Sequence, residues 1–171
     1  FCIIPKARGA FRSRTIESIK AEVERLAASG VKEVVLIAQD TTSYGIDLND
    51  GKPLLTTLLK ELTAVEGIEW IRMLYLYPTF FSDELLDIIV NEPKLCKYVD
   101  IPLQHVNNDI LKQMNRRDDR NDIERLLKKI RNAPTHITLR TSIIVGFPGE
   151  TDEQFEELCD FVKEIKFDNM G

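Results

Sequence analysis

The chain has 171 residues, of which 43% are hydrophobic and 30% charged, and a formal net charge of −5. This length and composition are typical of one globular domain, and they exclude a disulfide framework, because three scattered cysteines are too few, and a general polyphosphate binder, because the chain is acidic. Without a signal peptide or an apolar run long enough to cross a bilayer, we expect a cytoplasmic protein.

The first half of the sequence predicts two helices and two strands. Thr15 can cap a helix over residues 16–29, whose apolar side chains recur with a helical period. The apolar, β-branched run 34–38 indicates a strand buried on both faces. Pro53 suits the first turn of the next helix. The second strand is expected over residues 71–77.

The second half continues this alternation. Two more strands are expected over residues 99–103 and 137–145, and a fifth is expected to begin at Phe167. Helices are predicted after the cap Ser82, near Asn108, over residues 121–131 and after the capping-box residue Thr151. Regular alternation of this kind gives a parallel sheet with right-handed crossovers. The pattern alone fits either an open doubly wound sheet or part of a barrel.

Each predicted strand ends in a short polar signature. The four signatures are AQDTT at 38–42, LYLYP at 74–78, IPLQH at 101–105 and IVGFPGE at 144–150. In repeated β/α folds, ligands and chemistry gather at the carboxyl ends of parallel strands. We therefore expect Gln39, Tyr77, Gln104 and Gly146 to converge on one rim of the sheet.

The turn over residues 146–151 is the most specific of these signals. Its two glycines and a proline fix a tight turn whose backbone N–H groups can hold a polar ligand edge, but a purely structural turn fits equally well. Asp40 either accepts a hydrogen bond from a ligand or caps a turn. A lone histidine such as His105 is more often a satisfied structural group than a catalyst, and we assign no catalytic side chain.

Two stretches are basic within this acidic chain. Residues 112–131 carry eight basic groups against four acidic ones, which predicts a solvated helix face with mixed ion pairs. Residues 6–20 carry five basic groups against one acidic group and lie beside Cys2, where positive charge favours the thiolate. Cys159, on an apolar helix face, and Cys96, before a strand, are interpreted as structural.

Together these signatures resemble the radical-SAM methylthiotransferases. The run Phe1–Pro5, followed by Arg8-Gly9 and the Arg12–Arg14 segment, resembles the end and aftermath of that family's Cys-x-x-x-Cys-x-x-Cys motif, with Cys2 as the third cysteine. The likeness runs along the whole chain. It implies that residues 1–171 are part of the radical-SAM core domain, an incomplete parallel (β/α) barrel truncated at both ends. The family's N-terminal cluster-bearing domain and C-terminal TRAM domain would then be absent.

The strand ends further resemble one branch of the family, which methylthiolates an aspartate of a small-subunit ribosomal protein. Members that act on tRNA tend to carry Gly-Gln-Asn where this chain has residues 38–42, and Pro-Val-Gln-Ser where it has residues 102–105. The expected partners are therefore a small-subunit ribosomal protein and an electron-donor protein, with no membrane and no direct nucleic-acid contact. Two alternatives remain: a tRNA methylthiotransferase of the same family, and a non-catalytic β/α module.

The resemblance also implies the cofactors, a [4Fe–4S] cluster held by three thiolates and S-adenosylmethionine (SAM) at its open iron. Because Cys2 alone cannot complete a cluster, we expect this fragment to be inactive by itself. The positions that match the family's SAM-binding residues are Gln39 and Asp40 for the methionine part, Gln104 near the ribose, Ile144, Val145, Gly146 and Phe147 for adenine, and Arg12, Arg14 and Arg140 as carboxylate partners.

Overall fold

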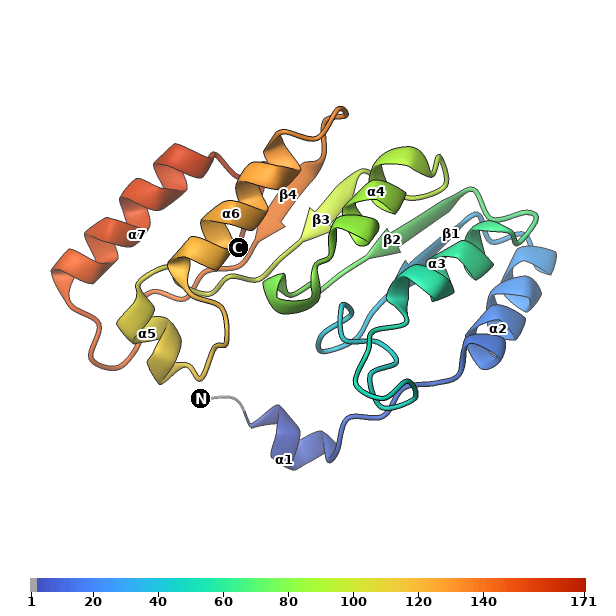
Figure 1. Cartoon of the computed structure of the whole chain (residues 1–171), viewed down its shortest axis with the longest axis horizontal. Helices are drawn as coiled ribbons and strands as arrows, with labels where there is room; N and C mark the ends of the chain where they lie inside the picture. The colour runs from blue at the N-terminus through green and yellow to red at the C-terminus, as the bar shows by residue number, and fades with distance from the viewer. Residues whose placement is uncertain (1–2) are drawn as a thin grey trace.

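A computed structural model describes residues 3–171, with only the backbone for Pro5 (Figure 1). Its main helices and strands alternate as predicted, in the order α2 (Ile16–Ala28), β1 (Glu33–Leu36), α3 (Leu55–Thr63), β2 (Trp70–Met73), α4 (Asp83–Asn91), β3 (Tyr98–Asp100), α6 (Arg120–Arg131), β4 (Thr138–Thr141), α7 (Asp152–Ile165) and β5 (Asn169–Met170). The shorter helices are α1 (Ile4–Arg8), η1 (Pro78–Phe80) and α5 (Asn108–Gln113).

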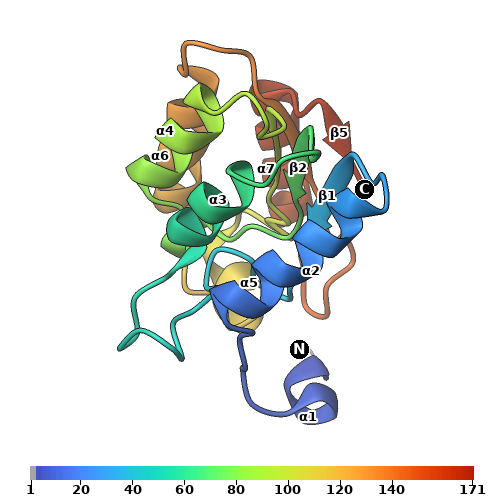
Figure 2. The ribbon, with the colours of Figure 1, turned by 90° about the vertical axis from the view of Figure 1, so that its right-hand side faces the viewer.

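All strand pairs are parallel, and the strands follow one another in chain order. β1 pairs with β2 from Glu33 opposite Trp70 onward, while β3, β4 and β5 form a second ladder. An isolated bridge between Ile71 and Leu95 brings the two ladders side by side. Helices α2, α3, α4, α6 and α7 pack on one face of this layer, whereas α1 lies apart from it (Figure 2). The architecture is an incomplete parallel (β/α) barrel, which resolves the choice left open by the alternation alone.

The helix starts follow from local capping. The Thr15 hydroxyl accepts from the Ser18 N–H, and Thr151 and Gln154 form the predicted capping box. The second predicted helix, α3, begins later than expected. Its first residue is Leu55, so Pro53 lies before the helix. The helix starts late because Leu54 N–H donates to the Tyr44 carbonyl and so still belongs to the preceding loop. The fifth strand likewise begins after Phe167, whose ring packs against Phe161 instead.

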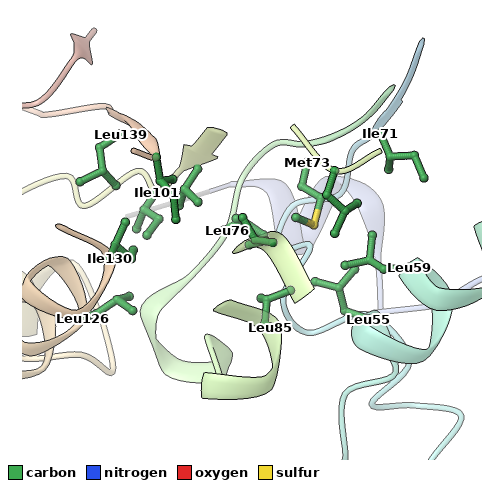
Figure 3. Close-up of a cluster of buried hydrophobic side chains, with 14 of the residues drawn as sticks. Leu55, Leu59, Ile71, Met73, Leu76, Leu85, Ile101, Leu126, Ile130 and Leu139 are labelled. Atoms are coloured by element: carbon green, nitrogen blue, oxygen red, sulfur yellow. The ribbon is translucent and has the colours of Figure 1, made fainter. Parts of the chain in front are cut away.

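The hydrophobic core lies between the sheet and the helices (Figure 3). It joins α3, α4 and α6 to the strands through Leu55, Leu59, Ile71, Met73, Leu76, Leu85, Ile101, Leu126, Ile130 and Leu139. Within residues 3–171, the other face of the sheet lacks such a cover, and there Val35 and Trp70 remain 42% and 52% exposed. Among residues 3–171, no helix combines the length and apolarity needed to span a membrane.

Leu59 offers a direct test of this core, because its side chain is 0% exposed between the helix layer and the sheet. Replacing Leu59 with Ala should lower the free energy of unfolding by about 2–5 kcal/mol, through lost burial and a residual cavity. Chemical denaturation of the intact protein would measure it. The matched control is Leu48→Ala, at a leucine that is 48% exposed, which should change stability by less than about 0.5 kcal/mol. Equal effects would contradict this placement of the core.

Candidate functional site

The carboxyl ends of the strands form one rim, joined by backbone hydrogen bonds. Thr41 N–H donates to the Tyr75 carbonyl over 2.9 Å, and Leu76 N–H donates to the Asp100 carbonyl over 2.8 Å. Ile144 N–H donates to the Gln104 carbonyl over 2.7 Å. The strand arrows in Figure 1 point toward this rim, on the side that carries α5. As expected from parallel strands, the four polar signatures lie along a single edge.

Two residues of this rim adopt a left-handed backbone. Tyr75 has φ of 57° and Gln104 has φ of 71°, a conformation that costs a non-glycine residue roughly 1–2 kcal/mol. Hydrogen bonds hold both, since Tyr75 N–H donates to Asp100 Oδ2 (3.2 Å) and Gln104 N–H donates to the Ser142 carbonyl (2.9 Å). Backbone strain of this kind, held in place by neighbouring hydrogen bonds, occurs preferentially at functional sites. The sequence carried no signal for it, because neither residue type favours positive φ.

Asp40 organises the turn after β1. Its carboxylate accepts from the Ser43 N–H over 3.1 Å and from the hydroxyls of Thr42 and Ser43. The Thr42 oxygen in turn accepts from the Tyr77 N–H over 3.1 Å, which joins this turn to the end of β2. Of the two interpretations of Asp40, the turn-capping one is therefore realised here. The neighbouring Gln39 is exposed on the rim.

The loop after β4 presents open backbone. Gly146 and Gly149 take φ of 71° and 86°, and a Cβ added at Gly146 would meet nothing within 4 Å. Val145 is 61% exposed, and within residues 3–171 neither its N–H nor its C=O has a hydrogen-bond partner. An exposed amide edge at a strand end can pair with the polar edge of a planar base. Ile144 and Phe147, which flank this edge, are half-buried.

Glu150 closes this loop and contacts His105. One carboxylate oxygen accepts from the Phe147 N–H over 2.9 Å, and the other lies 3.3 Å from His105 Nε2. Both side chains are almost fully buried, at 4% and 0% exposure. The expectation that His105 is a hydrogen-bonded structural group is confirmed. Its partner Glu150 was not predicted, although its place four residues after Gly146 was visible in the sequence.

The three arginines predicted as carboxylate partners differ in their surroundings. Arg140 Nη1 lies 2.8 Å from Asp100 Oδ1, and Asp100 is 1% exposed. This hydrogen bond raises the pKa of the Arg140 guanidinium. Arg14, which precedes α2, pairs with Glu22 and donates to the Ser18 hydroxyl, both on that helix. Arg12 is exposed. Arg140 and Arg14 thus each have an acidic partner, and Arg140 belongs to the sheet beneath the rim.

Arg116 is a rim residue that the sequence did not reveal. Its guanidinium lies 4.3 Å from the centre of the Tyr77 ring, and Nη2 donates to the Pro102 carbonyl. Burial lowers its pKa, and Nη1 is buried without a hydrogen-bond partner within residues 3–171. Arg116 and Asp118 both line a cavity of about 10 Å³. Asp118 accepts a hydrogen bond from the Thr79 hydroxyl, and burial raises the pKa of its carboxyl.

Elsewhere the basic stretch 112–131 behaves as predicted. Four of its cations pair with acidic side chains, in the contacts Arg120–Glu157, Arg125–Asp122, Lys129–Asp83 and Arg131–Asp168, while Lys112, Arg117 and Lys128 are exposed to solvent. Arg116 is the exception because the chain folds back between α5 and α6 at that point. Composition alone could not distinguish this inward-facing residue from its solvated neighbours.

The predicted metal ligand Cys2 lies outside the described residues. Among residues 3–171, no three His, Cys, Asp or Glu side chains are arranged to hold a metal ion. Cys96 and Cys159 are both free thiols, and burial raises the pKa of Cys96, as in an unreactive structural cysteine. The described residues thus provide a polar rim with an open backbone edge, and the donor set for a cluster would have to come from Cys2 and further thiolates.

Residues 1–162 of the chain match the Radical SAM superfamily in a comparison with known protein families. Two curated relatives, from Geobacter sulfurreducens and Clostridium novyi, are 53% and 54% identical over all 171 residues. Both are named ribosomal protein uS12 methylthiotransferase RimO. The matched region is 38% of the length of each, so the chain spans little more than a third of these proteins.

Two solved structures share the fold at low sequence identity. The radical S-adenosylmethionine methyltransferase TsrM of Kitasatospora setae has a TM-score of 0.71 at 20% identity, over 92% of this chain and 30% of its own. Coproporphyrinogen III oxidase of Escherichia coli has a TM-score of 0.64 at 16% identity, over 91% of this chain and 37% of its own. At such identities the likeness concerns the architecture, and it agrees with the incomplete parallel barrel described above.

Proposed function

Because the chain belongs to the Radical SAM superfamily, we propose that residues 1–171 are the core of a methylthiotransferase that modifies an aspartate of the ribosomal protein uS12. The observation that carries this proposal is the identity of 53–54% over the entire chain to relatives that bear that name. The strand-end signatures support the same branch, and the net charge of −5 suits a protein substrate better than a nucleic acid.

The rim fits the polar parts of SAM. In this proposal the adenine lies against residues 144–147, where the unpaired N–H and C=O of Val145 are exposed and the lack of a side chain at Gly146 leaves space. Gln104, fixed in its left-handed conformation, lies near the ribose. Gln39 faces the methionine part, and the role of Asp40 is to hold the turn that presents it.

The remaining assignments concern charge and metal. Arg140, still 35% exposed beside Asp100, is proposed as a partner of a carboxylate. Cys2 is proposed as one of three thiolates of a [4Fe–4S] cluster, which together with SAM supplies the radical chemistry when bound. The protein's part is to orient the ligand on the rim and to tune the cluster by burial and hydrogen bonds. An electron-donor protein completes the proposed set of partners.

The test is a reaction of the full-length protein reconstituted with iron and sulfide under anaerobic conditions. With SAM and a reductant, it should add a methylthio group to an aspartate of uS12, which peptide mass spectrometry detects. A parallel reaction with tRNA provides the competing substrate. Modification of tRNA alone would favour the tRNA-modifying branch instead. A full-length protein that binds neither iron nor SAM would support a non-catalytic β/α module.

A further inference from the structure

The buried pair of His105 and Glu150 joins two separate strand ends. His105 ends the signature after β3, and Glu150 closes the loop after β4, forty-five positions further along the chain. Their contact spans 3.3 Å between Nε2 and Oε1, with both side chains almost fully buried. It therefore links the part of the rim that carries Gln104 to the part that carries Gly146.

Hydrogen bonds on either side fix the roles of the atoms. The Asn107 N–H donates to His105 Nδ1 over 3.0 Å, so in the neutral ring the hydrogen lies on Nε2, which faces Glu150. Glu150 Oε2 accepts from the Phe147 N–H. Asn107 is itself held, since its side chain donates to Glu157 and accepts from Gln154, both on α7. One continuous chain of hydrogen bonds thus runs from α7 through His105 to the backbone of Phe147.

Glu150 closes the turn within this loop through two hydrogen bonds with Phe147. Gly146 is exposed and surrounded by open space. Without the His105 donor, one oxygen of a buried carboxylate would lose its partner, which is costly enough to make the carboxylate turn or admit water. Either change would release Phe147 and alter the exposed edge of Val145.

We propose that His105 is a positioning residue, which holds Glu150 so that the loop over residues 145–147 is pre-shaped for the adenine of SAM. This inference rests on the proposed function, because it assumes that SAM lies on the rim. His105 contacts no ligand itself in this account. Its effect should therefore be confined to ligands that contain adenine and should leave the cluster and the methionine part unaffected.

The experiment uses the reconstituted full-length protein and three substitutions. His105→Phe keeps the volume but removes the donor, His105→Gln restores an amide donor, and Glu150→Gln removes the carboxylate. The dissociation constant of SAM should rise about tenfold or more in His105→Phe, the size expected when a hydrogen bond to a charged group is lost. In His105→Gln it should remain within about threefold of wild type.

A second readout distinguishes positioning from general stability. Free methionine has no adenine, so the change that it is expected to cause in the electron paramagnetic resonance spectrum of the reduced cluster should be the same in all variants. Iron content should also be unchanged. If His105→Phe is folded, with a lower melting temperature but wild-type affinity for SAM, the inference is overturned, because His105 would then serve stability alone. If His105→Phe does not fold, Glu150→Gln gives the same test from the other side of the pair.

The experiment distinguishes failure of the proposed function from failure of this inference. If the wild-type protein assembles no cluster and binds no SAM, both the proposed function and this inference are overturned. If the wild type binds SAM and both folded variants bind it equally well, only the inference is overturned.

Discussion

Replacing Cys2 with Ala in the full-length protein should abolish cluster assembly and SAM cleavage while leaving the fold intact. A cluster of this kind needs three thiolates, so the loss of one leaves its ligand set incomplete, and no three His, Cys, Asp or Glu side chains within residues 3–171 form another such site. The fold should persist because residues from Ile16 onward build the core between the sheet and the helices. Iron content and release of 5′-deoxyadenosine are the measurements.

Cys159→Ala is the matched control for that prediction. Cys159 is a half-buried free thiol on α7, far along the chain from the basic segment that follows Cys2. It should keep full iron content and lose only a little stability. Wild-type iron content in Cys2→Ala would show that Cys2 is not a ligand. The assignment of residues 1–14 to a cluster-binding motif would then be wrong.

Gly146→Val should weaken SAM binding at least tenfold, which corresponds to about 1.4 kcal/mol. Valine is disfavoured at the φ of 71° that Gly146 adopts, so the loop would shift, and its branched side chain would project into the space proposed for adenine. A Cβ there meets no protein atom within 4 Å. The loss of binding would therefore not reflect a clash inside the fold. Equilibrium binding of SAM to the reconstituted protein measures it.

Gly30→Val separates this effect from backbone strain. Gly30 has φ of 94° and also has nothing within 4 Å of an added Cβ, but it follows α2 and precedes β1, at the opposite end of the strands. The control should therefore lose a similar amount of stability and keep its affinity for SAM. Equal loss of affinity in the two variants would remove the loop after β4 from the proposed site.

Local patterns predicted the alternation and the rim, because both depend on short-range periodicity. Strands, helices and caps such as Thr15 and Thr151 follow from spacing within a few residues. The ends of the strands were less accurate. The predicted strand over residues 137–145 is longer than β4, which ends at Thr141. Beyond that point, the Ile143 and Ile144 N–H groups donate to the carbonyls of Gly171 and Gln104, but these isolated contacts do not continue the strand.

Long-range contacts made the rest of the site unpredictable. The pairing of Arg140 with Asp100 joins positions 40 apart, and that of His105 with Glu150 joins positions 45 apart. The left-handed backbone of Tyr75 depends on the carboxylate of Asp100, which belongs to the next strand. No periodicity or composition encodes which side chain will face another after three β/α units have packed together.

The bonds that tie the strand ends also bear on how the chain folds. Thr42 and Tyr77, which share a hydrogen bond, lie 35 positions apart in the sequence. The Arg140–Asp100 and His105–Glu150 contacts along the rim close loops that are longer still. Because each loop must be closed at an entropic cost before its bonds form, such non-local pairings arise late. The helices and their caps can form first, and the rim is completed only after the units dock. Until then the strand edges are exposed, and that interval is when the chain is most prone to aggregate.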